Sequence, residues 1–214
     1  MDMENANSPS GEQGWIIVPL KPEYSREVSR VHLAAFPGFF LSYLGGRFLN
    51  IFYREVAVDR LGISFVALEP TKRTILGFVV GTQDPHGFFR RLAFRRSWEF
   101  GLLCVPALAK NPRIIPRIIR ALRYRGDAPE GRRRALLSSI AVVPELQNSG
   151  LGSILLKAWV GEAQKRGIAG SYLTTDKEGN DTVNRFYIRN GWHIETEFTT
   201  REGRTMLRYI LDFK

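Results

Sequence analysis

The turn Gln147–Gly152 constrains this chain more than any other stretch, because it carries two glycines between a predicted strand and a predicted helix. The strand is Leu136–Val143, a short apolar run that a Pro-Glu pair ends. The helix follows the second glycine, with apolar residues at helical spacing from Ile154 to Ala163. Glycine lets the backbone bend tightly and lets a ligand approach it, while the amides and dipole of a helix N-terminus attract anions. The turn therefore predicts a binding loop for a phosphate or pyrophosphate, and an ordinary strand-to-helix turn is the alternative.

Known phosphate-binding loops differ from this turn, which lacks both the Gly-Lys-Ser/Thr ending and the G-x-G-x-x-G pattern. The chain instead has Gln-x-x-Gly-x-Gly after Val-x-Pro-Glu, and a second motif, Asn-x-x-Val-x-x-Phe-Tyr-x-x-x-Gly-Trp, over Asn180–Trp192. In this order the two motifs resemble the acyl-CoA signature and the Asn-x-x-Ala-x-x-Phe-Tyr-x-x-x-Gly-Phe motif of the GCN5-related N-acetyltransferase (GNAT) superfamily. Val183 replaces the alanine of that second motif and Trp192 replaces its last phenylalanine.

The predicted elements follow the order of the GNAT fold, an α/β fold with a mixed central sheet flanked by helices. Residues 86–130 depart from it, because they are longer than a simple link between strands, and they predict a basic helical insert. The other elements that the periodicity predicts are strands at Trp15–Leu20, Ile63–Glu69, Thr74–Thr82, Ala169–Thr174, Trp192–Thr199 and Thr205–Phe213, and helices at Glu23–Ala35, Ser42–Val58 and Asn180–Asn190.

The length of 214 residues suits one domain, which we expect over residues 15–214 after a polar, disordered tail at 1–14. The single cysteine, Cys104, excludes an intrachain disulfide. The sequence has no apolar run of transmembrane length and no signal-peptide core, so we expect a cytoplasmic protein.

The net charge of +10 comes from one segment of the chain. Residues 90–134 hold thirteen Lys or Arg against three acids, whereas the rest of the chain is balanced. Three interpretations remain open: a solvated helical face, a binding surface for a phosphate-bearing substrate, and peripheral contact with an anionic membrane. No recognised module for binding nucleic acid accompanies the charge.

The resemblance implies direct transfer of an acetyl group from acetyl-CoA to an amine in a ternary complex, with no covalent enzyme intermediate. It implies that the strand before the turn splays from its neighbour, so that the backbone of Ile140, Ala141 and Val142 binds the pantetheine arm. The amides that would hold the pyrophosphate are those of Gln147, Asn148, Ser149, Gly150, Leu151, Gly152 and Ser153.

Two further site residues follow from the second motif. Asn180 matches the asparagine that hydrogen-bonds the pantetheine arm, and a helix N-cap is its alternative role. Tyr187 matches the tyrosine that donates a proton to the thioester sulfur, and a core aromatic is its alternative role. No metal site is expected, because the three histidines are scattered and the cysteine is alone.

The general base has no clear candidate, because Leu136–Val143 contains no carboxylate. Glu69, Asp84 and His86 lie near predicted strand ends, and Ser138 or Ser139 can relay a proton through water. We expect His32 and His193 to be structural or exposed.

The acceptor is suggested by the basic segment and by Phe36–Phe40 with Gly45 and Gly46, which looks like a subset of the superfamily associated with surface polysaccharide synthesis. This favours a small amine such as a phosphate-bearing amino sugar. The alternatives are a polyamine, an antibiotic or a protein amine, or a non-catalytic acyl-CoA-binding module at a membrane surface.

Overall fold

The computed structural model describes residues 14–85, 87–88, 91, 134–200 and 203–213. The tail predicted at 1–14, except Gly14, lies outside these residues, as do His86 and nearly all of the insert predicted at 86–130. The described strands are β1 (Ile16–Pro19), β2 (Gly62–Glu69), β3 (Thr74–Thr82), β4 (Arg134–Val142), β5 (Gly170–Asp176), β6 (His193–Thr199) and β7 (Thr205–Asp212). The described helices are η1 (Pro22–Tyr24), α1 (Ser25–Ala35), α2 (Phe40–Tyr43), α3 (Gly45–Val58), η3 (Pro144–Leu146), α7 (Leu151–Lys165) and α8 (Asp181–Arg189).

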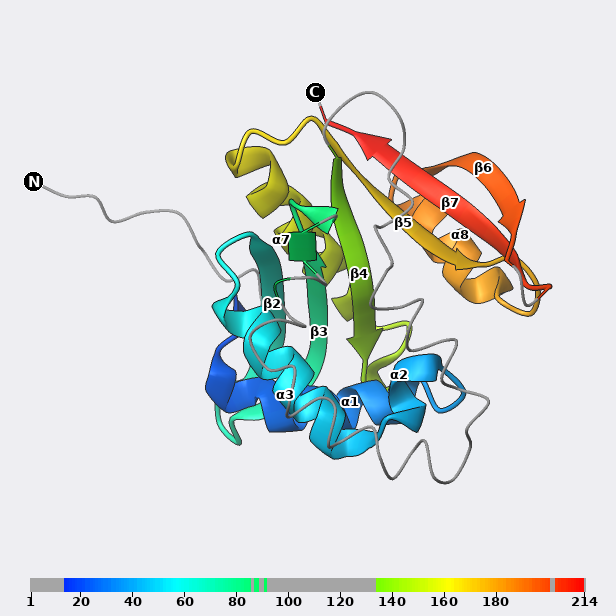
Figure 1. Cartoon of the computed structure of the whole chain (residues 1–214). Helices are drawn as coiled ribbons and strands as arrows, with labels where there is room; N and C mark the ends of the chain where they lie inside the picture. Colours follow the sequence, from blue (N-terminus) through cyan, green and yellow to red (C-terminus); the bar gives the residue numbers. More distant parts are fainter. Residues whose placement is uncertain (1–13, 86, 89–90, 92–133, 201–202, 214) are drawn as a thin grey trace, which may run out of the picture.

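All of the described strands form one mixed sheet in the order β1-β2-β3-β4-β5-β7-β6 (Figure 1). Every neighbouring pair is antiparallel except β4 and β5, which run parallel. The strand β4, which precedes the glycine turn, is thus central, and a crossover through α7 connects it to its parallel neighbour β5. The predicted α/β fold with a mixed sheet is confirmed.

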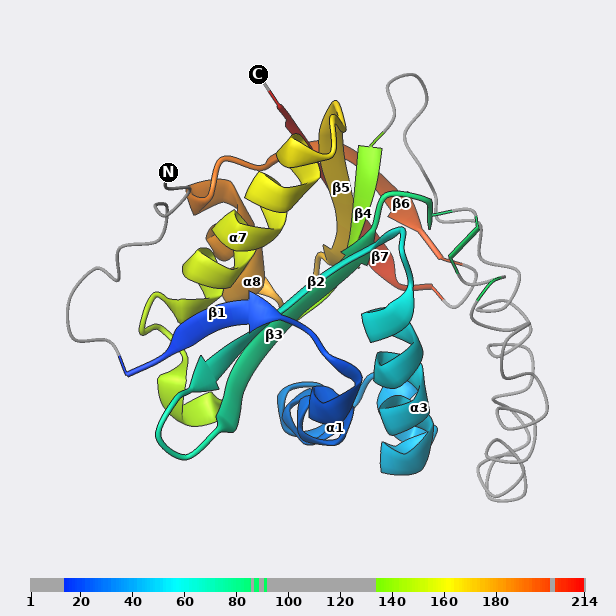
Figure 2. The same cartoon turned by 90° about the vertical axis from the view of Figure 1, so that its left-hand side faces the viewer.

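Helices cover both faces of the sheet (Figures 1 and 2). On one face α1 and α3 bury a cluster that includes Val28, Phe52 and Phe78. On the other face α7 and α8 bury a second cluster around Trp159, whose indole Nε1 donates a 3.0 Å hydrogen bond to the carbonyl oxygen of Ile63 in β2. Both faces of the sheet are therefore covered by amphipathic helices, as the apolar spacing predicts.

The helix predicted at Ser42–Val58 is in fact two helices, and this prediction was wrong in its continuity. The short α2 ends at Tyr43, and α3 begins at Gly45, whose φ of +85° lies in the left-handed region. A periodicity in apolar residues does not register a single left-handed glycine, because the apolar stripe resumes after it.

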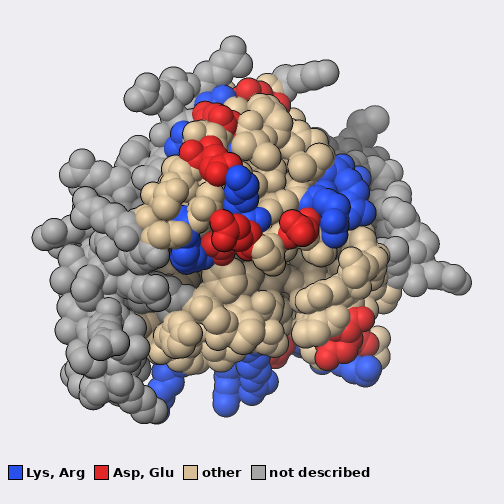
Figure 3. Space-filling model, turned by 90° about the vertical axis from the view of Figure 1, so that its right-hand side faces the viewer, with Lys and Arg blue, Asp and Glu red and all other residues tan. Residues whose placement is uncertain are grey.

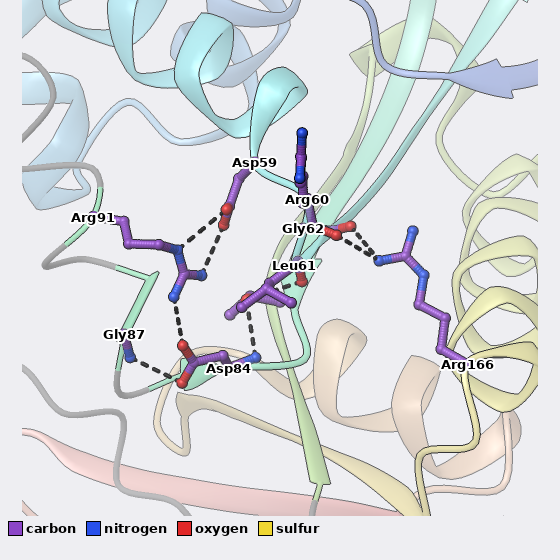
Figure 4. Close-up of polar contacts among 9 residues, drawn as sticks. Asp59, Arg60, Leu61, Gly62, Asp84, Gly87, Arg91 and Arg166 are labelled. Carbon is purple, nitrogen blue, oxygen red and sulfur yellow. Dashed lines mark hydrogen bonds and ion pairs between the residues drawn. The ribbon is translucent and has the colours of Figure 1, made fainter.

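Two arginine contacts fix the corner between α3 and β2 (Figure 4). Arg91 binds the carboxylate of Asp59 through Nε (3.2 Å) and Nη2 (2.9 Å), and it also pairs with Asp84. Arg166, just after α7, donates from Nη1 to the carbonyl oxygens of Arg60 (3.3 Å) and Gly62 (2.8 Å). The segment that follows β3, through Arg91, and the end of α7, through Arg166, therefore both contact the turn between α3 and β2.

Candidate active site

The sheet divides between β4 and β5. These strands pair only over Arg134–Leu136 and Gly170–Tyr172, and beyond Leu136 β4 keeps only its contacts with β3 among the described strands (Figure 1). The backbone of Ile140, Ala141 and Val142 thus has one edge without a strand partner in the described part of the chain. We call this opening the β4–β5 split, and it matches the splay that the sequence resemblance implied.

A β-bulge lies where the split begins. Val80 pairs with Ser139 and Gly81 pairs with Leu137, so Ser138 is the extra residue of β4. Ser138 is exposed although it belongs to a central strand. A bulge bends the strand that carries it and increases its twist, which explains why β4 turns away from β5 at this point.

The glycine turn lies at the end of β4 and carries two left-handed residues, Asn148 (φ 64°) and Gly150 (φ 88°). Ser149 stabilises it by donating from Oγ to the carbonyl oxygen of Leu146 (2.7 Å). A Cβ atom at Gly150 would meet no atom within 4 Å, so the glycine is needed for its backbone conformation and the space beside it is open.

The structure distinguishes the backbone amides that the sequence had grouped together. The amides of Gln147, Ser149 and Ser153 already donate to carbonyl oxygens at 3.0–3.3 Å. Leu151 makes only a long contact of 3.4 Å with Ser149 Oγ. The amides of the three remaining residues, Asn148, Gly150 and Gly152, donate no hydrogen bond to any described residue, so they fit a pyrophosphate at the start of α7.

Helix α8 closes the other side of the same region. A Cβ atom at Gly152 would lie 3.4 Å from the ring of Phe186 and 3.9 Å from Cγ2 of Val142. The turn, the end of β4 and α8 therefore meet, which brings the two sequence motifs together.

Tyr187 of α8 lies in this meeting region and is 6% exposed. Its ring packs against those of Phe186, Trp192 and Tyr209 at centroid distances of 5.2–6.0 Å. Burial, and secondarily Tyr209, raises the pKa of the Tyr187 hydroxyl well above its usual range, so the phenol remains protonated at neutral pH. The residue is thus a core aromatic that also retains a proton to donate.

Asn180 does not act as the side-chain N-cap of α8, which was its alternative role. Its Nδ2 donates to Thr175 Oγ1 (2.8 Å) and to the carbonyl oxygen of Asp176 (3.0 Å). These bonds fix the side chain against the end of β5, on the far side of the split from β4.

Two of the acids considered as general bases are engaged elsewhere. Glu69 pairs with Lys72 at 3.6 Å in the β2–β3 turn. Asp84 pairs with Arg91 and accepts a 3.0 Å hydrogen bond from the amide of Gly87. Because β3 and β4 are antiparallel, Asp84 follows the end of β3 that lies beside the start of β4, away from Val142.

The sequence did not point to Tyr53, and it gave His32 only a structural or exposed role. His32 is buried, whereas His193 is exposed. The Tyr53 hydroxyl lies 2.6 Å from His32 Nδ1, so the two buried polar groups are paired with each other. A tyrosine within the buried stripe of α3 was the available signal, since a buried phenol usually finds a polar partner.

Charges on the β5–β7–β6 side of the sheet are paired. Figure 3 shows basic and acidic side chains interleaved on that side of the molecule. The pairs there are Lys177–Glu197, Arg204–Asp176 and Arg208–Glu195. The described residues of this hairpin therefore give no surface of a single sign.

Two kinds of feature are absent from the described residues. They include no cluster of three or more His, Cys, Asp or Glu side chains that could hold a metal ion. They also include no helix with the length and apolarity needed to cross a membrane.

Comparisons with solved structures show the same fold at low sequence identity. Ard1 from Thermoplasma volcanium superposes with a TM-score of 0.61 at 13% identity, covering 94% of this chain and 99% of that one. The ribosomal-protein-S18-alanine N-acetyltransferase from Escherichia coli gives 0.56 at 15% identity, with 92% and 93% covered. The PaiA N-acetyltransferase from Thermoplasma acidophilum, solved with coenzyme A, gives 0.51 at 14% identity, with 92% and 98% covered.

A search by sequence among curated proteins finds no match. The sequence model of the acetyltransferase (GNAT) family, in contrast, matches residues 27–192, which include both motifs and the β4–β5 split. The chain therefore belongs to the acetyltransferase (GNAT) family and is an N-acetyltransferase that uses acetyl-CoA as its acetyl donor.

Proposed function

We propose that the β4–β5 split is the acetyl-CoA site and that the acetyl group passes there to a primary amine by direct attack in a ternary complex. Acetyl-CoA supplies an activated thioester. The unpaired backbone edge of Ile140, Ala141 and Val142 suits an extended amide-containing arm, which can pair with it as a strand would. The unbonded amides of the turn suit its pyrophosphate. This coincidence of a free strand edge with a free helix N-terminus is the observation that carries the proposal.

Tyr187 and Asn180 have complementary roles in this proposal. Tyr187 is the proton donor to the departing thiolate, and its buried, protonated phenol supports that role. Asn180 orients the pantetheine arm, which is supported by its side chain being held against β5 rather than capping α8.

The acceptor that we propose is a small amine that carries phosphate, such as a phosphorylated or nucleotide-linked amino sugar. The support is the excess of thirteen basic over three acidic residues in 90–134, which attracts phosphate and repels a lysine-rich peptide. The same charge supports a secondary contact with anionic membranes. We also propose that residues 15–214 form a single acetyltransferase domain.

The test is release of the CoA thiol from acetyl-CoA with a panel of amines: nucleotide-linked amino sugars, free amino sugars, polyamines, aminoglycosides and short peptides. We expect release with the phosphate-bearing sugars and much less with their dephosphorylated counterparts. Preference for a polyamine, an aminoglycoside or a peptide would replace the proposed acceptor. If no amine causes release of the CoA thiol although acetyl-CoA binds tightly, the result would favour a non-catalytic acyl-CoA-binding module.

Membrane contact is tested separately, by sedimentation with vesicles of anionic and neutral lipids. We expect binding to anionic vesicles at low salt that is lost at high salt, because salt screens charge attraction between surfaces. An absence of binding at low salt would remove this part of the proposal.

A further inference from the structure

The open edge of β4 is limited at both ends. At one end the start of α7 meets it, because a Cβ atom at Gly152 would lie 3.9 Å from Cγ2 of Val142. At the other end β5 occupies the edge, because its pairing with β4 extends as far as Leu136. An extended ligand that starts at the glycine turn can therefore follow β4 back from Val142, and it must stop before Leu136.

The length of the pantetheine arm decides where a thioester would lie on this edge. The arm that joins the pyrophosphate to the sulfur has about as many bonds in its backbone as four amino-acid residues, and it spans roughly 14 Å when extended. Four residues of a strand rise about 13 Å. Because Ser138 precedes Val142 by four residues, the thioester reaches the β4 bulge.

The bulge offers one exposed polar side chain at this place. Ser138 is exposed, and its hydroxyl makes no hydrogen bond with any described residue. Ser139, the other serine that the sequence suggested, is half-buried and pairs regularly with Val80. A serine hydroxyl has one proton to donate and two lone pairs that accept, so that of Ser138 can hold the N–H of an incoming amine.

We propose that Ser138 is a catalytic residue for acetyl transfer, whose hydroxyl accepts a hydrogen bond from the acceptor amine and so directs the nitrogen lone pair at the thioester carbonyl. The proposal rests on the proposed function, in which acetyl-CoA lies along β4. Orienting two reacting groups in this way lowers the barrier to their reaction.

The proton transfers balance in this arrangement. The nitrogen lone pair forms the C–N bond as the C–S bond breaks, and the electrons of the C–S bond leave with the sulfur. The amine proton passes through the Ser138 hydroxyl to water, because that hydroxyl accepts one proton as it releases its own. The departing thiolate takes the proton of Tyr187, which then regains one from water.

Substitutions at Ser138 separate the hydroxyl from the backbone of the bulge. Ser138→Ala removes the hydroxyl, whereas Ser138→Thr keeps it. Ser64→Ala is the matched control, because Ser64 is a half-buried serine of β2 whose hydroxyl also makes no hydrogen bond with a described residue, and β3 separates its strand from β4. Ser139→Ala tests the neighbouring hydroxyl.

The expected pattern follows the hydroxyl. We expect kcat of Ser138→Ala to fall by roughly ten- to a hundredfold, with the Kd for acetyl-CoA within about twofold of wild type, because the hydroxyl meets the amine rather than the cofactor. Ser138→Thr should recover most of the loss, and Ser64→Ala should match wild type. Wild-type kcat in Ser138→Ala would overturn the proposal. So would a loss confined to Ser139→Ala, or an equal loss in Ser138→Ala and Ser138→Thr.

The disulfide of CoA locates the sulfur without relying on activity. In Ser138→Cys the new thiolate can attack this disulfide, which forms a mixed disulfide with one CoA and releases the other as a thiol. We expect intact mass measurements to show this adduct forming more than roughly tenfold faster than in Ser64→Cys, because binding holds the sulfur beside the bulge. Wild type gives the background from Cys104. Equal rates in the two variants would overturn the placement of the thioester and the role of Ser138 with it.

The two experiments together distinguish failure of this inference from failure of the proposed function. If wild type acetylates an amine and Ser138→Ala is equally active, only the role of Ser138 is refuted. If the CoA disulfide modifies Ser138→Cys rapidly but wild type acetylates no amine of the panel, acetyl transfer itself is refuted, and the role of Ser138 falls with it.

Discussion

Tyr187 combines two properties that are usually found apart, since it is packed among three aromatic rings and its pKa is raised so that it keeps its proton. Tyr187→Phe preserves the packing and removes the proton donor. We predict a fall in kcat of about ten- to a hundredfold with little change in acetyl-CoA affinity. Steady-state kinetics and calorimetry measure the two quantities, and an unchanged kcat would exclude Tyr187 as the acid.

At the residue scale, the sequence was informative where a motif fixes the backbone and uninformative where a contact is long-range. The tight turn at Gly150 was predictable because glycine is the residue that bends a backbone most freely, and the structure has this glycine in the left-handed region at φ 88°. The contact between Tyr53 and His32 was not predictable, because it joins residues whose proximity depends on the packing of α3 against α1. Asn180 shows a third case, in which a good N-cap residue hydrogen-bonds β5 instead.

At the scale of elements, α7 is held to the sheet by one buried polar contact in an apolar interface. Trp159→Phe would remove the buried indole donor to the carbonyl oxygen of Ile63. We predict a loss of about 1–3 kcal/mol in the free energy of unfolding, measured by urea denaturation, with the acetyl-CoA Kd little changed. A variant as stable as wild type would mean that the indole bond contributes nothing.

Most helices and strands were predictable from periodicity, but the feature that makes the site was not. Apolar alternation placed β4 and β5, and no local pattern showed that they pair over only three residues each. Strand pairing depends on the partner and on the bulge at Ser138, so it cannot be read from one strand. The divergence was anticipated only through the family resemblance of the turn that follows β4.

At the scale of the whole molecule, the buried His32 makes stability depend on pH. Burial lowers the pKa of His32 from 6.5 to about 4. The unfolded chain therefore binds this proton more readily, and stability present above pH 6.5 is lost as the pH falls toward 4. We predict that the free energy of unfolding falls by about 2 kcal/mol between pH 7 and pH 5 because of this residue.

Urea denaturation of wild type and of His32→Asn at pH 7 and pH 5 measures this loss of stability, and the variant should lose less. Equal losses would show that His32 is not responsible.

The central claim for the whole molecule is that the turn after β4 holds acetyl-CoA at the β4–β5 split. The most direct test is calorimetric titration of acetyl-CoA into wild type, Gly150→Glu and Gly167→Glu. The two glycines lie at opposite ends of α7, both are left-handed, and a Cβ atom at either meets nothing within 4 Å. Both substitutions therefore place a side chain on a left-handed backbone, and only the first places a carboxylate beside the open amides. We predict that Gly150→Glu abolishes measurable binding, whereas Gly167→Glu binds like wild type. Wild-type affinity in Gly150→Glu would contradict the claim.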